Sequence, residues 1–262
     1  MDPDKVVRLV TALKLSSSPN KDPPITFEAD SLLIGEQRIG RCLVAKVFSS
    51  KAVNHEAFVN QIPRILQATK HIEIGVLGDN LFLLDFKSIQ DKKRALYGGP
   101  WNLFRDLIIF REPSGMQTPN MMSFTEISIW IQCYNLPLIF LHKDFLEKLG
   151  NHLGVVEEID TKENGFAMGR YARVKVRIDI SKPLKQHIRL SLASDEDEVF
   201  VIFSYERLPD FCYNCGIIGH SFRNCDVDPQ EKGKLNYISW LKAVQRGGGR
   251  VKSRQSSPPN TW

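Results

Sequence analysis

The 262-residue sequence lacks any run of about 18 apolar residues, which is the length that a membrane-spanning helix needs. Its first ten residues, MDPDKVVRLV, lack the long apolar core of a secretory signal peptide. Cysteine is scarce, with five in the chain, and three of these share a 14-residue window with a histidine, which favours a metal site over a disulfide framework. The sequence therefore predicts an intracellular protein that has no membrane contact.

Charge of one sign does not dominate either. The chain has 35 Lys and Arg against 30 Asp and Glu, a formal net charge of +5. That balance is compatible with a polyanionic partner but does not demonstrate one.

Enzyme motifs are missing as well. The sequence shows no acidic metal-binding cluster, no glycine loop that could cradle a phosphate, and no Ser/His/Asp or Cys/His arrangement for a nucleophile. The scattered histidines are expected to be surface or packing residues: His55, His71, His142, His152 and His187. We therefore expect a protein that is not an enzyme and has no small-molecule substrate.

What is present indicates an α+β protein with real cores, because 42% of the residues are hydrophobic and 25% are charged. After a flexible lead-in at 1–29, residues 30–115 read as strands at 42–48, 72–76, 81–86 and 103–111. Helices are predicted at 55–68 and 89–96, the first ended or kinked by Pro63. This β-α-β-β-α-β order is typical of ferredoxin-like and RRM-like domains.

The third predicted strand weakens an RNA-binding role for this domain. If Phe82, Leu84 and Phe86 form its buried face, Leu81, Leu83 and Asp85 form its open face. Those side chains cannot stack bases well. We therefore expect a packing or protein-contact domain. Its alternative roles are self-association and the binding of a protein partner.

A second α+β unit, mostly sheet, is predicted at 120–208, with strands at 127–133, 155–159, 171–180, 187–192 and 199–205 and a helix at 143–153. Residues 228–262 are predicted to form a short helix and a disordered basic tail. The tail carries Arg246, Arg250, Lys252 and Arg254, which bind nucleic acid non-specifically or only solubilise the chain. The expected location is intracellular, the nucleus in preference to the cytoplasm.

The firmest motif lies at 209–227, where Cys212, Cys215, His220 and Cys225 have the spacing C-x2-C-x4-H-x4-C. Two cysteines three apart can bind one ion from a single turn, and four such ligands suit tetrahedral Zn²⁺. So short a segment cannot bury a core, and zinc binding, worth about 10–16 kcal/mol in zinc-finger peptides, supplies its folding free energy. Four protein ligands leave no position for an activated water, which favours a structural ion.

This motif resembles the CCHC zinc knuckle of retroviral nucleocapsid and retrotransposon proteins. The resemblance implies that Tyr213 and Phe222 stack exposed bases, with Arg223 beside them. The alternative is that both rings cover the zinc loop or dock on the sheet. Arg223 is the one cation of the loop, and Asp226 and Asp228 follow it, so we expect phosphate contacts from elsewhere in the chain.

One source of positive charge is a strand at 171–180. Alternation places Arg173, Lys175 and Arg177 on one face, where they could contact phosphates. The alternative is a solvated sheet face balanced by cross-strand acids, for which Asp195, Glu196, Asp197 and Glu198 in the following segment are available.

A wider resemblance covers residues from about 30 to the knuckle and a short motif after it. It rests on these segments: Gly99-Pro-Trp101, Trp130-Ile-Gln, Asn135-Leu-Pro137, Gly169-Arg-Tyr-Ala-Arg-Val-Lys-Val-Arg177, Lys182-Pro-Leu184, Tyr205-Glu-Arg-Leu-Pro209, Phe211-Cys-Tyr, and Tyr237 through Trp240-Leu-Lys-Ala243. The chain resembles plant zinc-knuckle proteins with an N-terminal domain of unknown function, related to the first-open-reading-frame or gag-like products of LINE-type retrotransposons.

Together these patterns predict a zinc-dependent, non-enzymatic protein that binds single-stranded RNA or DNA. The alternative is a protein-interaction adaptor in which the knuckle is a structural staple.

Overall fold

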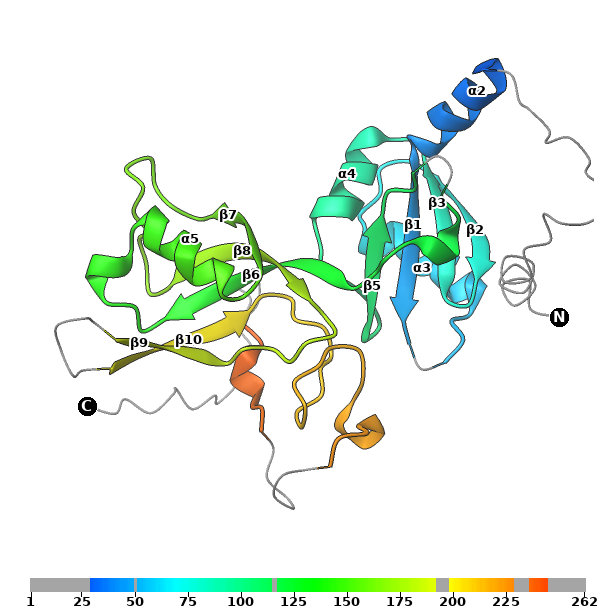
Figure 1. Ribbon diagram of the computed structural model, residues 1–262. Coiled ribbons are helices and arrows are strands. Elements are labelled where there is room, and N and C mark those ends of the chain that lie inside the picture. Colours follow the sequence, from blue (N-terminus) through cyan, green and yellow to red (C-terminus); the bar gives the residue numbers. More distant parts are fainter. Residues whose placement is uncertain (1–28, 50, 115–116, 192–197, 229–235, 245–262) are drawn as a thin grey trace, which may run out of the picture.

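The computed structural model of the chain describes residues 29–49, 51–114, 117–191, 198–228 and 236–244 (Figure 1). Two five-stranded antiparallel sheets follow one another along the chain, each with helices, so the fold is α+β as predicted. Within the described residues no helix has the length and apolarity that crossing a membrane would take. The predicted lead-in and the basic tail lie outside the described residues.

The first unit comprises α2 (Ala29–Ile39), β1 (Cys42–Phe48), α3 (His55–Ile65), β2 (Ile72–Gly78), β3 (Leu81–Phe86), α4 (Ile89–Tyr97), β4 (Trp101–Leu103) and β5 (Asp106–Arg111). Its strand order is β2-β3-β1-β5-β4. Disregarding the short β4, this is the order of an RRM-like, ferredoxin-like sheet, which confirms the predicted fold class. Apolar side chains of α3 and α4, among them Phe58, Ile62 and Ala95, pack with one face of the sheet to form its core.

Two predicted elements of the first unit differ from the structure. The helix α3 continues two residues beyond Pro63 and ends at Ile65, three residues before its predicted end. The last strand is split into β4 and β5, because Phe104 turns the chain with a left-handed backbone (φ 57°). A turn at Phe104 has no glycine or asparagine to mark it in the sequence.

The second face of the first sheet is less open than predicted. Leu81 is 6% exposed and Asp85 5% exposed, so the prediction that both lie on an open face is wrong. The carboxylate of Asp85 is covered by the guanidinium groups of Arg38 and Arg41, at 3.9 and 3.4 Å. On the same sheet, Leu107 and Ile109 of β5 belong to the core of the second unit.

The second unit comprises β6 (Glu126–Tyr134), α5 (Lys143–Asn151), β7 (Val155–Ile159), β8 (Ala172–Asp179), β9 (His187–Ser191) and β10 (Glu198–Tyr205). Single 3₁₀ turns precede β6 and α5, at Pro119–Met121 and Leu138–Phe140. The strand order β7-β8-β6-β10-β9 repeats that of the first unit position by position. The segment between β8 and β9 forms no helix, so α4 has no counterpart here.

Candidate metal centre

The knuckle segment, residues 209–227, follows β10 and is built on a short hairpin (Figure 1). Phe211 and Ile218 form an antiparallel bridge, and the Cys212 amide donates to the Ile217 carbonyl at 2.9 Å. The amide of Gly216 donates back to the Cys212 carbonyl at 2.8 Å. This bond closes the turn that carries Cys212 and Cys215. These local bonds follow from the spacing of the sequence.

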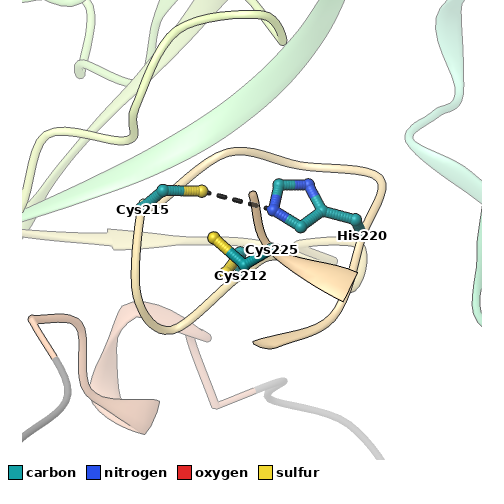
Figure 2. Close-up of side chains that lie close together, drawn as sticks. All are labelled: Cys212, Cys215, His220 and Cys225. Carbon is teal, nitrogen blue, oxygen red and sulfur yellow. Dashed lines mark hydrogen bonds between the residues drawn. The ribbon is translucent and has the colours of Figure 1, made fainter. Parts of the chain in front are cut away.

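The predicted ligands converge at one point (Figure 2). The Sγ atoms of Cys212, Cys215 and Cys225 and a ring nitrogen of His220 all lie within 4.8 Å of one another, and Cys215 Sγ is 3.3 Å from His220 Nε2. A tetrahedral zinc ion, about 2.3 Å from sulfur and 2.0–2.1 Å from nitrogen, needs ligand atoms about 3.4–3.8 Å apart. Small shifts of these side chains reach that geometry, so the cluster can hold a metal ion.

The surroundings of the cluster shift the pKa values of two of its thiols in opposite directions. Hydrogen bonds from the Asn214 amide and then from His220 lower the pKa of the Cys225 thiol to about 6. Burial raises the pKa of the Cys215 thiol to about 11. A coordinated thiol is deprotonated outright, so a metal ion would hold all three sulfurs as thiolates.

Asn214 is a site residue that the sequence analysis missed. It is buried, and its Nδ2 donates to the Val227 carbonyl at 2.7 Å and to Cys225 Sγ at 3.5 Å. It therefore orients the last ligand from outside the coordination sphere. An asparagine between two cysteines carries no signal of this role until the fold brings Val227 beside it.

The knuckle segment is packed into the second unit. Phe211, Ile218 and Leu241 are buried in the core that β6, β8 and β10 form, in the unit that has no counterpart of α4. Zinc-binding residues and the core of the sheet are therefore one packed structure. The knuckle is therefore part of the second unit and not a separately folded module.

A segment after the knuckle, residues 236–244, holds it against the sheet. The Tyr237 amide donates to the Tyr213 carbonyl at 3.0 Å, and Ser204 Oγ donates to the Trp240 carbonyl at 2.8 Å. Lys242 forms a parallel bridge with Tyr205 at the end of β10. The short helix predicted here is a single 3₁₀ turn, Ser239–Leu241.

The two aromatic rings predicted to stack bases lie in different surroundings. Tyr213 is half-buried and packs on Phe211, with ring centroids 4.7 Å apart. Phe222 lies in the 3₁₀ turn Phe222–Asn224 and is 46% exposed, with Arg223 exposed beside it. Of the two, Phe222 is the more exposed to solvent.

The predicted basic strip lies on the solvent face of β8, as alternation predicted, but two of its cations are paired with acids. Arg173 donates two hydrogen bonds to the Glu206 carboxylate, at 2.8 and 2.7 Å, and its guanidinium lies 3.8 Å from the centroid of the Trp130 ring. The hydrogen bond to Glu206 raises the pKa of Arg173. Arg177 lies 3.8 Å from Glu126 and 3.9 Å from the Glu157 carboxylate.

Among the described residues, the acids that balance the strip lie outside the segment 195–198 that the sequence analysis named. Residues 192–197 lie outside the described part of the chain, and Glu198 pairs with Arg189 at 3.3 Å. Glu206 also accepts from Gln132 at 2.7 Å. Burial raises the pKa of Glu206, but the hydrogen bonds from Arg173 and Gln132 outweigh it, so the net pKa is lowered. The Arg173–Glu206 pair is therefore a structural ion pair. Lys175 lies opposite Glu158 in the register of β7 and β8.

Two family models match parts of the chain. A family model described as a zinc knuckle matches residues 178–227, and one described as a domain of unknown function, DUF4283, matches residues 35–112. The zinc-knuckle match begins in β8 and includes β9 and β10, in keeping with a knuckle that is packed on those strands.

Two individual proteins are similar over part of the chain. An uncharacterized protein of Arabidopsis thaliana is 26% identical over 101 residues, which is 38% of this chain and 32% of that protein, so the match spans about a third of the relative. A solved structure of the first two RRM domains of yeast poly(U)-binding protein aligns with 52% of this chain and 82% of its own, at 12% identity and a TM-score of 0.23. A superposition this loose adds nothing to the strand order, on which the fold assignment rests.

Proposed function

We propose that this chain is a non-enzymatic, zinc-dependent protein that binds single-stranded nucleic acid, RNA in preference to DNA. The observation that carries the proposal is the pairing of a complete CCHC ligand set with an exposed ring, Phe222, and an exposed cation, Arg223, on one short segment. An exposed ring beside a cation can stack a base and contact its phosphate. A likeness to retrotransposon first-open-reading-frame or gag-like proteins, and a place in the nucleus, belong to the same proposal.

The knuckle by itself should bind nucleic acid weakly. Three thiolates around Zn²⁺ leave the site with about one negative charge. One stacked ring is worth about 1–3 kcal/mol. The phosphate contacts would come from the half-buried Lys175, from the exposed Arg177, whose contacts with Glu126 and Glu157 are long at 3.8 and 3.9 Å, and from the basic tail outside the described residues. Arg173 contributes less to phosphate binding because it is paired with Glu206.

A structural role for the ion supports the absence of catalysis. The cluster offers four protein ligands, which fill a tetrahedral zinc. No position is then left for a water that zinc could activate. We therefore propose that the ion shapes the loop and performs no chemistry, and that the protein has no small-molecule substrate.

The test is a binding titration with a fluorescently labelled single-stranded RNA, repeated with the same sequence as DNA. Phe222→Ala should weaken binding about 5- to 150-fold, the loss of one stacked base, at every salt concentration. Phe200→Ala is the matched control, because Phe200 is also 46% exposed but lies on β10. The wild-type affinity should fall steeply with salt.

Two results would contradict the proposal. One is no detectable binding of RNA or single-stranded DNA at low salt. The other is equal affinity of the wild type and the Phe222→Ala variant, which would leave the knuckle without a role in binding.

A second candidate function is a protein-interaction adaptor in which zinc staples the knuckle to the sheet. It is favoured by the packing of Tyr213 on Phe211 and by the burial of Ile218 and Leu241 in the core of the second unit. In this version a tagged chain retains a specific partner after nuclease treatment. Loss of every retained protein with nuclease would count against it.

A further inference from the structure

The outer edge of β2 is an unprotected sheet edge. Its strand ends the order of the first sheet and pairs with β3, and no other strand of the described residues pairs with its outer edge. An edge strand presents unpaired N–H and C=O groups to any strand that approaches. The seven residues of β2, Ile-Glu-Ile-Gly-Val-Leu-Gly, include no proline and one charge. That charge, Glu73, is held by Lys87 at 2.8 Å.

The other three edges carry the usual protection against strand pairing. The edge strand of the second sheet that corresponds to β2 is β7, which has Glu157 and Glu158 within its five residues. The strand β9 carries His187 and Arg189, and β4 is three residues long. A bulge between Val76 and Gly78 interrupts the pairing of β2 with β3 at Leu77, and β7 has a similar bulge between Val156 and Glu158. β2 is therefore not shortened, and its single charge, Glu73, is paired with Lys87.

Apolar side chains on β2 are left uncovered. Val76 is 56% exposed and Leu77 is 38% exposed. In the register with β3, Ile74 lies opposite Leu84 and Val76 opposite Phe82, and both partners belong to the core of the first unit. Ile74 and Val76 thus extend the core of the first unit to the edge of the sheet, where they are partly exposed to solvent.

We propose that β2 pairs with β2 of a second copy of this chain, antiparallel about a two-fold axis at Gly75, so that two sheets join into one. A two-fold interface uses the same patch on both copies, so the patch must be complementary to itself. Pairing centred on Gly75 sets Ile74 opposite Val76 of the other copy on the helix-covered face. It places each Glu73 near the bulge at Leu77 of the other copy, so the two carboxylates do not face each other.

The first experiment measures mass by sedimentation velocity over a range of concentrations with the zinc-loaded chain. The wild type should reach twice its 29.9 kDa monomer mass. Val76→Lys should lose the dimer, because two ammonium groups would enter an apolar contact next to the axis. The matched control is Val155→Lys, which alters an equally exposed valine (51%) on β7 and should leave the dimer unchanged.

The second experiment tests the register. A Cβ at Gly75 meets nothing within 4 Å, so Gly75→Cys should fold. Opposite residues of an antiparallel pair have Cα atoms about 4.5–5.5 Å apart, so a short bis-maleimide should link Gly75→Cys chains into covalent dimers. Val155→Cys should remain monomeric under the same treatment. The wild type, whose cysteines are buried or in the ligand set, measures the background.

The proposal is overturned by a wild type that stays monomeric at every concentration. It is equally overturned by a dimer that survives Val76→Lys, or by Gly75→Cys chains that crosslink no faster than Val155→Cys chains.

Discussion

Replacing Gly216 by alanine tests how the knuckle is packed against residues 236–244. Gly216 has a left-handed backbone (φ 77°), and a Cβ there would collide with the ring of Tyr237. Gly219 is also left-handed (φ 101°), but a Cβ there meets nothing within 4 Å. Both glycines have a positive φ, and only at Gly216 does a Cβ meet another side chain.

The expected costs follow from that difference. Alanine in a left-handed conformation costs about 1–2 kcal/mol, which applies to both variants. Removing a fully buried large aromatic side chain costs about 3–5 kcal/mol, so displacing the half-buried Tyr237 should add about 2 kcal/mol. Because metal binding supplies the folding free energy of the knuckle, these costs appear as weaker zinc affinity. Gly219→Ala should weaken it about 5- to 30-fold, and Gly216→Ala about 100- to 1,000-fold.

The assay is competition for zinc between the protein and a coloured chelator, for both single variants and for Gly216→Ala in a Tyr237→Ala background. Removing the ring removes the obstacle, so the added cost of Gly216→Ala should shrink to that of Gly219→Ala. Equal zinc affinities for the two single variants would refute the packing of Tyr237 on the zinc loop. So would a Gly216→Ala cost that Tyr237→Ala leaves unchanged.

Other predictions concern the ion pairs and the zinc ion. Arg173→Ala should lower the free energy of unfolding in urea by about 1–3 kcal/mol, because it removes two charge-assisted hydrogen bonds to Glu206. Arg189→Ala, which breaks the exposed pair with Glu198, should lower it by about 0–1 kcal/mol. Glu206 has a pKa below its ordinary value of 4.5, so the stability that it contributes is present above pH 4.5 and is lost as the pH falls through its lowered pKa. The stability gap between wild type and Glu206→Gln should therefore be constant near neutral pH and close in acid; a gap that stays constant in acid would contradict this. Chelation of zinc should change the fluorescence of Trp240 and expose residues 236–244 to protease, and protease resistance without zinc would show that this segment docks independently of the ion.

Sequence reasoning reached what is local in the chain. The spacing of Cys212, Cys215, His220 and Cys225 fixes the ligand set within one loop, and alternation along β8 fixes which side chains share a face. The order of strands in the first unit followed from hydrophobic periods, turn residues and the βαββαβ pattern. Each of these depends on neighbours a few residues apart.

What sequence reasoning missed depends on tertiary contacts. The acid that holds Arg173 is Glu206, 33 residues away on the chain after β10, and it became a partner through the register of β8, β6 and β10. Tyr213 is half-buried because Phe211 and residues 236–244 pack around it. The burial of Asp85 depends on arginines more than 40 residues earlier in the chain. Pair distances of this kind are set by the fold and leave no periodic mark in the sequence.

Zinc-dependent binding of single-stranded nucleic acid is tested most directly by one reversible titration. The affinity of the full chain for a labelled single-stranded RNA is measured with zinc bound, after removal of zinc by a chelator, and after zinc is added back in excess. The account predicts strong binding at low salt, a large loss without zinc, and recovery when zinc returns. An affinity that is the same in all three states, or no binding in any of them, would contradict it.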